Sequence, residues 1–158
     1  MRERAQHSPP SFGLAATLLV LLPVVVGCGG PLGPLPGGEL SGAEVACPRA
    51  FPADVREIEI EVRPDDPYSV TTWNVVQGGR LYIPADFLNP VKRWPYFLEA
   101  DPRIRIRTGA LVYACQATRV EDADTIDRLR LAAAKKYDLD PEGAAASTEV
   151  WWFTVSRR

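Results

Sequence analysis

The stretch YSVTTWNVVQGGRLYIP (residues 68–84) contains the clearest fold signal in this 158-residue chain. Its first part, residues 68–77, is rich in β-branched and aromatic residues, which favour strands. Gly78 and Gly79 follow, and two successive glycines suit a two-residue hairpin turn because both central positions can take positive φ. Residues 80–84 then predict the returning strand. We therefore expect a β-hairpin here.

Four further strands are predicted on either side of this hairpin. Before it, VREIEIEV (residues 55–62) alternates apolar and acidic residues, and a period of two predicts a strand with one buried face. After it, RIRIRTG (residues 103–109) alternates isoleucine with arginine, and residues 110–120 predict a long strand. The last strand is predicted over EVWWFTVS (residues 149–156).

Two helices are predicted between these strands. Pro95 suits the first turn of a short helix that begins near Trp94. A long helix over about residues 123–137 carries charges that complement the helix dipole: Asp122, Asp124 and Asp127 near its start, Lys135 and Lys136 at its end. We expect a mainly β fold, in which a six-stranded antiparallel sheet curls into a barrel with one short and one long helix on its outside.

Two charged stripes have identical spacing on different predicted strands: Glu57, Glu59 and Glu61 on one, Arg103, Arg105 and Arg107 on the other. In one interpretation the stripes neighbour each other or face water, and facing opposite charges stabilise a sheet by roughly 0.2–1 kcal/mol per pair. In the other, the arginine stripe binds an anionic cofactor or substrate. The sequence leaves both open.

The first 27 residues have the organisation of a secretory signal peptide. Arg2 and Arg4 stand near the start, and residues 14–26 are almost purely apolar. This run is shorter than the roughly 20 residues that a membrane-spanning helix needs. The run ends in Val25, Val26, Gly27 and Cys28.

That ending resembles the lipobox of bacterial lipoproteins. The resemblance implies that Cys28 carries a diacylglyceryl group, becomes the new N-terminus and anchors the chain to a lipid bilayer. Two acyl chains anchor stably where one does not. Gly29, where an aspartate favours inner-membrane retention, resembles the pattern of lipoproteins on the periplasmic face of the outer membrane if the host is Gram-negative. The alternative is a buried cysteine in a hydrophobic helix.

The remaining chain divides by composition. Residues 28–46 are dominated by glycine and proline without periodicity, which is typical of a tether between an anchor and a folded domain. Residues 47–158 are expected to form one domain with a modest core. Cys47 and Cys115 lie in it, and in an oxidising compartment an even number of cysteines suggests a disulfide. Two independent buried thiols are the alternative.

Charge and histidine content exclude several functions. Of 18 basic and 20 acidic residues, the signal peptide holds Arg2, Arg4 and Glu3, which leaves 16 and 19 in the mature chain. An acidic balance argues against nucleic acid as a partner. The only histidine, His7, is also lost with the signal peptide. Histidine-based catalysis and histidine-ligated metal are therefore excluded, and no metal partner is expected.

The order of motifs along residues 55–156 resembles the pyridoxamine-phosphate-oxidase-like split barrels, and most closely their flavin- and deazaflavin-binding branch. The segments that carry the resemblance are VTTWNVVQGGRLYIPA, KRWPYFLEADPRIRIRTGALVYACQATRVED, AAAKKYDL and TEVWWFTV. Their matching positions are Thr72, Trp73, Gly78, Gly79, Trp94, Asp101, Pro102, Lys136 and Tyr137.

The resemblance implies a split barrel, a homodimer, and FMN or a deazaflavin in a groove between the two subunits. The implied cofactor-binding residues are Thr71, Thr72, Trp73, Pro84, Ala85, Asp86, Lys92, Arg93 and Trp94. Lys92 and Arg93 would pair with phosphate, and Trp73 and Trp94 would stack on the ring. The alternatives are an exposed loop end for the cations, core positions for the rings, and a cofactor-free lipoprotein that binds a ligand or a protein. The cofactor would carry out any redox chemistry, and the protein would orient it.

Overall fold

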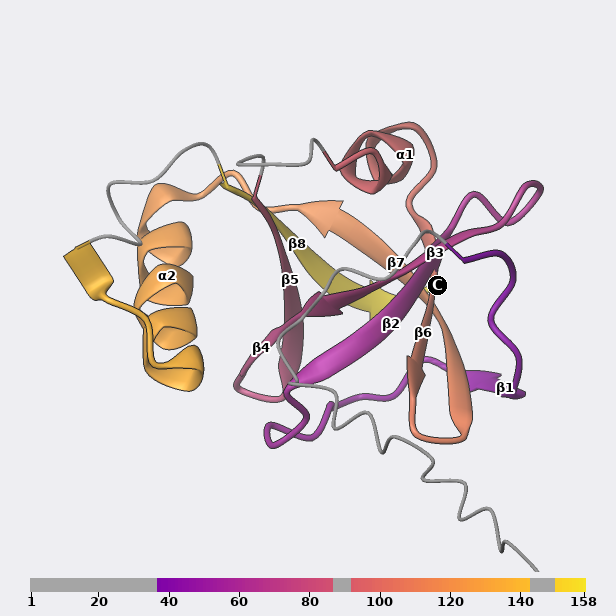
Figure 1. Cartoon of the computed structure of the whole chain (residues 1–158), viewed down its shortest axis with the longest axis horizontal. Helices are drawn as coiled ribbons and strands as arrows, with labels where there is room; N and C mark the ends of the chain where they lie inside the picture. The colour runs from indigo at the N-terminus through magenta and orange to yellow at the C-terminus, as the bar shows by residue number, and fades with distance from the viewer. Residues whose placement is uncertain (1–36, 87–91, 143–149) are drawn as a thin grey trace, which may run out of the picture.

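The computed structural model describes residues 37–86, 92–142 and 150–158. Figure 1 shows a curled sheet with one helix over its end and one at its side. The elements in chain order are β1 (Ala43–Ala46), β2 (Glu57–Val62), β3 (Tyr68–Trp73), β4 (Val75–Gln77), β5 (Arg80–Asp86), α1 (Trp94–Ala100), β6 (Arg103–Thr108), β7 (Leu111–Arg119), α2 (Ala123–Tyr137) and β8 (Val150–Arg157).

The strands form one sheet in the order β3-β2-β6-β7-β8-β5-β4, with β1 beside β7. All neighbouring pairs along this path are antiparallel. Because β3 and β4 stand at opposite ends of the order and yet follow each other in the chain, the sheet must curl on itself. This confirms the expected mainly β split barrel with two helices. The described residues form eight strands rather than the six expected.

One extra strand arises because the segment expected as a single strand over residues 68–77 breaks at Asn74. This side chain is completely buried, and its Nδ2 donates to the carbonyl oxygens of Val55 and Arg56 at 3.1 and 3.2 Å. Lys136 on α2 donates to both the backbone and the side-chain oxygen of Asn74, each at 3.0 Å. Burial lowers the pKa of Lys136. A buried amide thus fixes the bend between β3 and β4.

The other extra strand, β1, lies in the segment that the composition assigned to the tether. Residues 37–46 instead pack on the sheet: β1 runs parallel to β7, from Ala43 beside Leu111 to Ala46 beside Ala114. Strand β8 pairs with β7 only from Cys115 onward. The first half of β7 is therefore free on that side to pair with β1. A strand of only four residues has no sequence pattern by which it could be predicted.

Cys47 and Cys115 form a disulfide at the point where β1 ends and β8 takes its place beside β7. Their Cα atoms are 5.0 Å apart, and both residues are buried. The bond joins the N-terminal segment to the centre of the sheet. The signal peptide and Cys28 lie outside the described residues. None of the helices within the described residues is long and apolar enough to cross a membrane.

Two apolar clusters lie on opposite faces of the sheet. The interior cluster contains the isoleucines of β2, β5 and β6, and α1 adds Trp94 and Leu98 to it. In the second cluster, Leu129 of α2 packs with Val75 and Trp152 on the other face. The short helix therefore closes one end of the barrel, and the long helix covers its outside (Figure 1).

Candidate functional site

The end of the barrel beside α1 holds part of the expected site. Pro84 and Ala85 lie near the end of β5, opposite Trp152 and Trp151 of β8. Asp86, the last residue of β5, is opposite Val150. Lys92 and Arg93 directly precede the first turn of α1. The structure thus brings the predicted turn and the predicted cations to the same end of the sheet.

The two tryptophans expected to stack on a cofactor are engaged within the protein. Trp94 is only 2% exposed, and its ring packs against Phe153 with centroids 5.6 Å apart. Trp73 stacks on Tyr137 of α2 at 4.4 Å with an interplanar angle of 13°. Burial raises the pKa of Tyr137, whose hydroxyl donates to the carbonyl oxygen of Arg56 at 2.6 Å. One face of Trp73 is therefore covered by the long helix.

Thr71 and Thr72 lie with Trp73 near the far end of β3, away from α1. Tyr68, at the start of the same strand, contacts Phe97 of α1 with centroids 5.5 Å apart, whereas Trp73 meets α2. The expected set is thus divided between two places: residues of β3 near α2, and residues of β5 and the α1 start.

An aromatic and cationic cluster that the sequence analysis did not identify lies at the α1 end. Trp151 packs edge-on against Tyr96 at 5.2 Å, and the guanidinium of Arg119 lies 3.7 Å from the centre of the Trp151 ring. Arg119 also pairs with Glu99 of α1 at 3.7 Å. We call Tyr96, Arg119 and Trp151, together with the adjoining Lys92 and Arg93, the α1 cluster.

The signal for this cluster is present in the sequence EVWWFTVS. Adjacent residues of a strand point to opposite faces, so the two tryptophans had to lie on different faces of the sheet: Trp152 packs with Leu129 under α2, and Trp151 packs against the interior cluster. Trp152 is 2% exposed, and Trp151 is the partly exposed one. Choosing between them requires the register of β8, which the local sequence does not supply.

The α1 cluster has the chemistry that a phosphorylated ring compound needs. Tyr96 is 51% exposed and offers a ring face, and Arg93 is exposed at the helix start with its guanidinium 5.7 Å from the Phe97 ring. The described ranges contain no histidine, so haem would have no imidazole ligand there. They also contain no group of three residues suited to hold a metal ion.

The arginine stripe on β6 is neutralised by acids. The register places Glu59 opposite Arg107 and Glu61 opposite Arg105. Arg105 is 2.9 Å from Glu61, which is 2% exposed, and Arg107 pairs with Glu59. The hydrogen bond from Arg107 lowers the pKa of Glu59. The pairing interpretation is thus confirmed at these positions.

The third arginine, Arg103, faces no glutamate of β2. Its Nε lies 2.9 Å from both carboxylate oxygens of Asp101, and its Nη2 lies 3.3 Å from Asp65. The hydrogen bond from Arg103 lowers the pKa of Asp101. All three arginines of the stripe thus have carboxylate partners, which disfavours this stripe as a ligand site.

Comparison with known proteins identifies the fold. No protein-family model and no curated protein matches the sequence. Among solved structures, a conserved hypothetical protein from Mycobacterium tuberculosis superposes with a TM-score of 0.55 at 15% identity, covering 67% of this chain and 75% of that one.

Two other structures of similar fold have described roles. The haem-storage protein HutZ from Vibrio cholerae gives a TM-score of 0.54 at 12% identity, with 66% of this chain and 83% of that chain covered. An F420-H2 dependent reductase gives 0.52 at 13% identity, with 75% and 100% covered. At such identities the likeness shows the fold, a split barrel.

Proposed function

We propose that this chain binds a phosphorylated flavin or deazaflavin at the α1 cluster and acts as an oxidoreductase module. The observation that carries the proposal is an exposed ring, Tyr96, on the short helix that Lys92 and Arg93 directly precede, at one end of the barrel. A phosphate needs charge-assisted donors and a planar ring needs an aromatic face. Similar folds hold a deazaflavin reductase, which supports the same class of cofactor.

The roles of the residues follow from their positions. Lys92 and Arg93 precede α1 and would hold the phosphate, with Arg93 suited to a two-pronged contact. Tyr96 would stack on the ring, while Trp151 and Arg119 keep Tyr96 in place. Bound cofactor would supply hydride transfer, and the protein would bind and orient it. Trp94 would support the site from the core.

A titration tests this function. The full chain carrying Cys28→Ser is titrated with FMN and, separately, with F420, while tryptophan fluorescence is followed. We expect saturable quenching, weakened by about tenfold or more in Lys92→Ala/Arg93→Ala because two charged contacts are lost. The matched control is Arg128→Ala/Lys135→Ala on α2, which removes the same charge and should leave binding unchanged. Equal affinity in both double variants would contradict the proposal.

A cofactor-free binding lipoprotein is the second candidate. It is favoured by the engagement of Trp94 in the core and of Trp73 with Tyr137, because both rings expected to stack on a cofactor already have partners. In that case neither FMN nor F420 quenches the fluorescence, and co-purification from the host envelope should recover a protein or small-molecule partner instead.

Anchoring and assembly are further parts of the proposal. Cys28 would hold the chain on the envelope membrane, and labelling with radioactive palmitate should mark the wild-type chain but not Cys28→Ser. The homodimer is tested by light scattering on the purified chain, where twice the mass of one chain is expected. A monomer that still binds FMN would place the site within a single subunit.

A further inference from the structure

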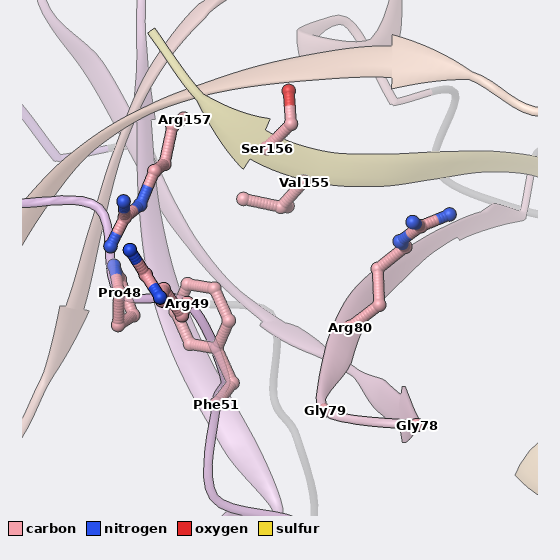
Figure 2. Close-up of a pocket in the computed structure, with 9 residues that line it drawn as sticks. All are labelled: Pro48, Arg49, Phe51, Gly78, Gly79, Arg80, Val155, Ser156 and Arg157. Carbon is pink, nitrogen blue, oxygen red and sulfur yellow. The ribbon is translucent and has the colours of Figure 1, made fainter.

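A hollow lies at the opposite end of β8 from Trp151 of the α1 cluster. It has a volume of about 310 Å³, at the low end of the range for small-molecule sites. Its lining comes from the start of β5 and the turn before it, the segment after Cys47, and the end of β8 (Figure 2): Pro48, Arg49, Phe51, Gly78, Gly79, Arg80, Val155, Ser156 and Arg157. We call it the arginine pocket. It contains no residue of the α1 cluster.

The floor of the arginine pocket is apolar and well fixed. Phe51 and Val155 are 8% and 5% exposed, and the Phe51 ring packs edge-on against Tyr113 at 5.8 Å. The Phe51 amide donates to the carbonyl of Gly79 at 2.9 Å, which ties the two loops together. Gly79 has φ of 79°, and a Cβ there would lie 3.0 Å from that of Ala50. Only glycine suits this close approach.

The rim of the pocket is cationic and carries no counter-charge. Figure 2 shows the guanidinium groups of Arg49 and Arg157 close together on one wall, with Arg80 on the facing wall and its head group turned outward. None of the nine lining residues is acidic. Within the described parts of the chain, none of these three arginines forms an ion pair.

Two neighbouring guanidinium groups without a carboxylate repel each other, and an anion between them removes that repulsion. The backbone holds one of them in place, because Arg157 Nε donates to the carbonyl of Cys47 at 3.2 Å. The disulfide of Cys47 fixes that carbonyl in turn. The fold therefore positions Arg157 independently of any ligand.

We propose that the arginine pocket binds the phosphate group of a small phosphorylated molecule. Arg49 and Arg157 form the phosphate contact, and Arg80, whose long side chain can rotate inward, adds the third cation. A phosphate monoester carries about two negative charges at neutral pH and three acceptor oxygens, so it matches three guanidinium groups better than a carboxylate does. The apolar floor at Phe51 and Val155 receives the organic part of the ligand.

The test uses the full chain carrying Cys28→Ser and calorimetric titration with phenyl phosphate, inorganic phosphate and benzoate. We expect saturable binding of phenyl phosphate, weakened by about tenfold or more in Arg49→Gln. Arg128→Gln, which removes an exposed arginine from α2, is the matched control and should bind as the parent does. Circular dichroism checks that each variant is folded, and Arg49 is chosen because no described backbone group depends on it.

Other outcomes identify the molecule that carries the phosphate and test whether the pocket recognises phosphate at all. Arginine-dependent binding to phosphatidylglycerol vesicles, but not to phosphatidylcholine vesicles or to the soluble esters, would support the phosphate site and assign it to a lipid headgroup. Benzoate binding as tight as phenyl phosphate would overturn the phosphate assignment. Unchanged affinity in Arg49→Gln would overturn the site. Loss in Lys92→Ala/Arg93→Ala alone would assign the binding to the α1 cluster, so the two proposals can fail separately.

Discussion

The arginine stripe and the arginine pocket place three arginines each on different surfaces, with opposite electrostatic surroundings. In the stripe, every guanidinium has a carboxylate partner: Glu59 and Glu61 are opposite Arg107 and Arg105, and Asp101 meets Arg103. In the pocket, the three arginines come from separate segments and no acid lines the hollow. The arginines that alternate regularly in the sequence form ion pairs within the protein. The arginines that come from separate segments line the pocket without an acid beside them.

Strand register explains the difference. A regular pattern of alternate residues places its side chains on one face, and a neighbouring strand of matching period supplies a partner at each step. Arg49 lies in a loop, Arg80 is opposite Gln77 and Arg157 is opposite Cys115, so none of the three has an acid across the sheet. Charges brought together by tertiary structure alone are therefore better candidates for ligand binding.

The largest expected effect is on the disulfide that supports the pocket. The Cys47–Cys115 bond closes a separation of 68 residues, and the loop-entropy model gives about 4 kcal/mol of stability for a loop of this length. Cys47→Ala/Cys115→Ala should lower the free energy of unfolding in urea by about that amount. Wild-type protein treated with a reductant is the control and should shift by a similar amount. An unchanged urea midpoint would show that the bond adds no stability.

The next largest effect is expected at Glu61, the buried glutamate of β2 that pairs with Arg105 of the arginine stripe. Glu61 is 2% exposed and accepts from Arg105 and from the Leu40 amide, the latter at 2.6 Å. Glu61→Gln leaves the charge of Arg105 largely buried without its main counter-charge, so the free energy of unfolding should fall by about 3 kcal/mol. Thermal and urea unfolding of the purified variant measure this change.

Arg103→Gln is the matched control for that change, because it breaks an ion pair at the exposed end of the same stripe. Exposed pairs contribute less than about 1 kcal/mol. Equal losses of unfolding free energy in Glu61→Gln and Arg103→Gln would contradict this prediction. They would mean that burial does not determine how much the ion pairs of the stripe stabilise the protein.

The fold was largely predictable because its signals are local. Alternation, β-branched residues, the Gly78–Gly79 turn and the charge order of α2 predict six strands and two helices. All occur except that the strand expected over residues 68–77 forms two, β3 and β4. The break at Asn74 was not predictable, since it depends on carbonyls of residues 55 and 56 that are distant in sequence. The same holds for β1, which occupies an edge that exists only because β8 begins its pairing at Cys115.

The candidate sites were predictable only in part, because they depend on which strand ends meet. Lys92 and Arg93 were identified from sequence, and they do lie beside an exposed ring at one barrel end. Tyr96 and Arg119 were missed, because their contacts with Trp151 require the register of β8 against β5 and β7. The arginine pocket was missed for the same reason: its three cations are far apart in sequence.

The smallest expected effect is the acid sensitivity that the stripe confers. The hydrogen bond from Arg107 lowers the pKa of Glu59 below its ordinary value of 4.5, and Arg103 lowers that of Asp101 in the same direction. Below pH 4.5 the unfolded chain then binds more protons than the folded one, so stability is fully present above this pH and is lost as the pH falls through the lower folded pKa.

Urea unfolding measured between about pH 7 and about pH 3 should therefore show a falling free energy on the acid side, and Glu59→Gln should make that fall shallower. Glu57→Gln is the control on the same strand, since Glu57 forms no ion pair with a described residue and its removal leaves the Arg107 contact intact. Arg49→Gln in the pocket should leave the fall in unfolding free energy at acid pH unchanged, because no carboxylate lines the pocket beside that arginine. A smaller fall in unfolding free energy at acid pH in Arg49→Gln would show that Arg49 has a carboxylate partner. It would argue against the arginine pocket as an anion site.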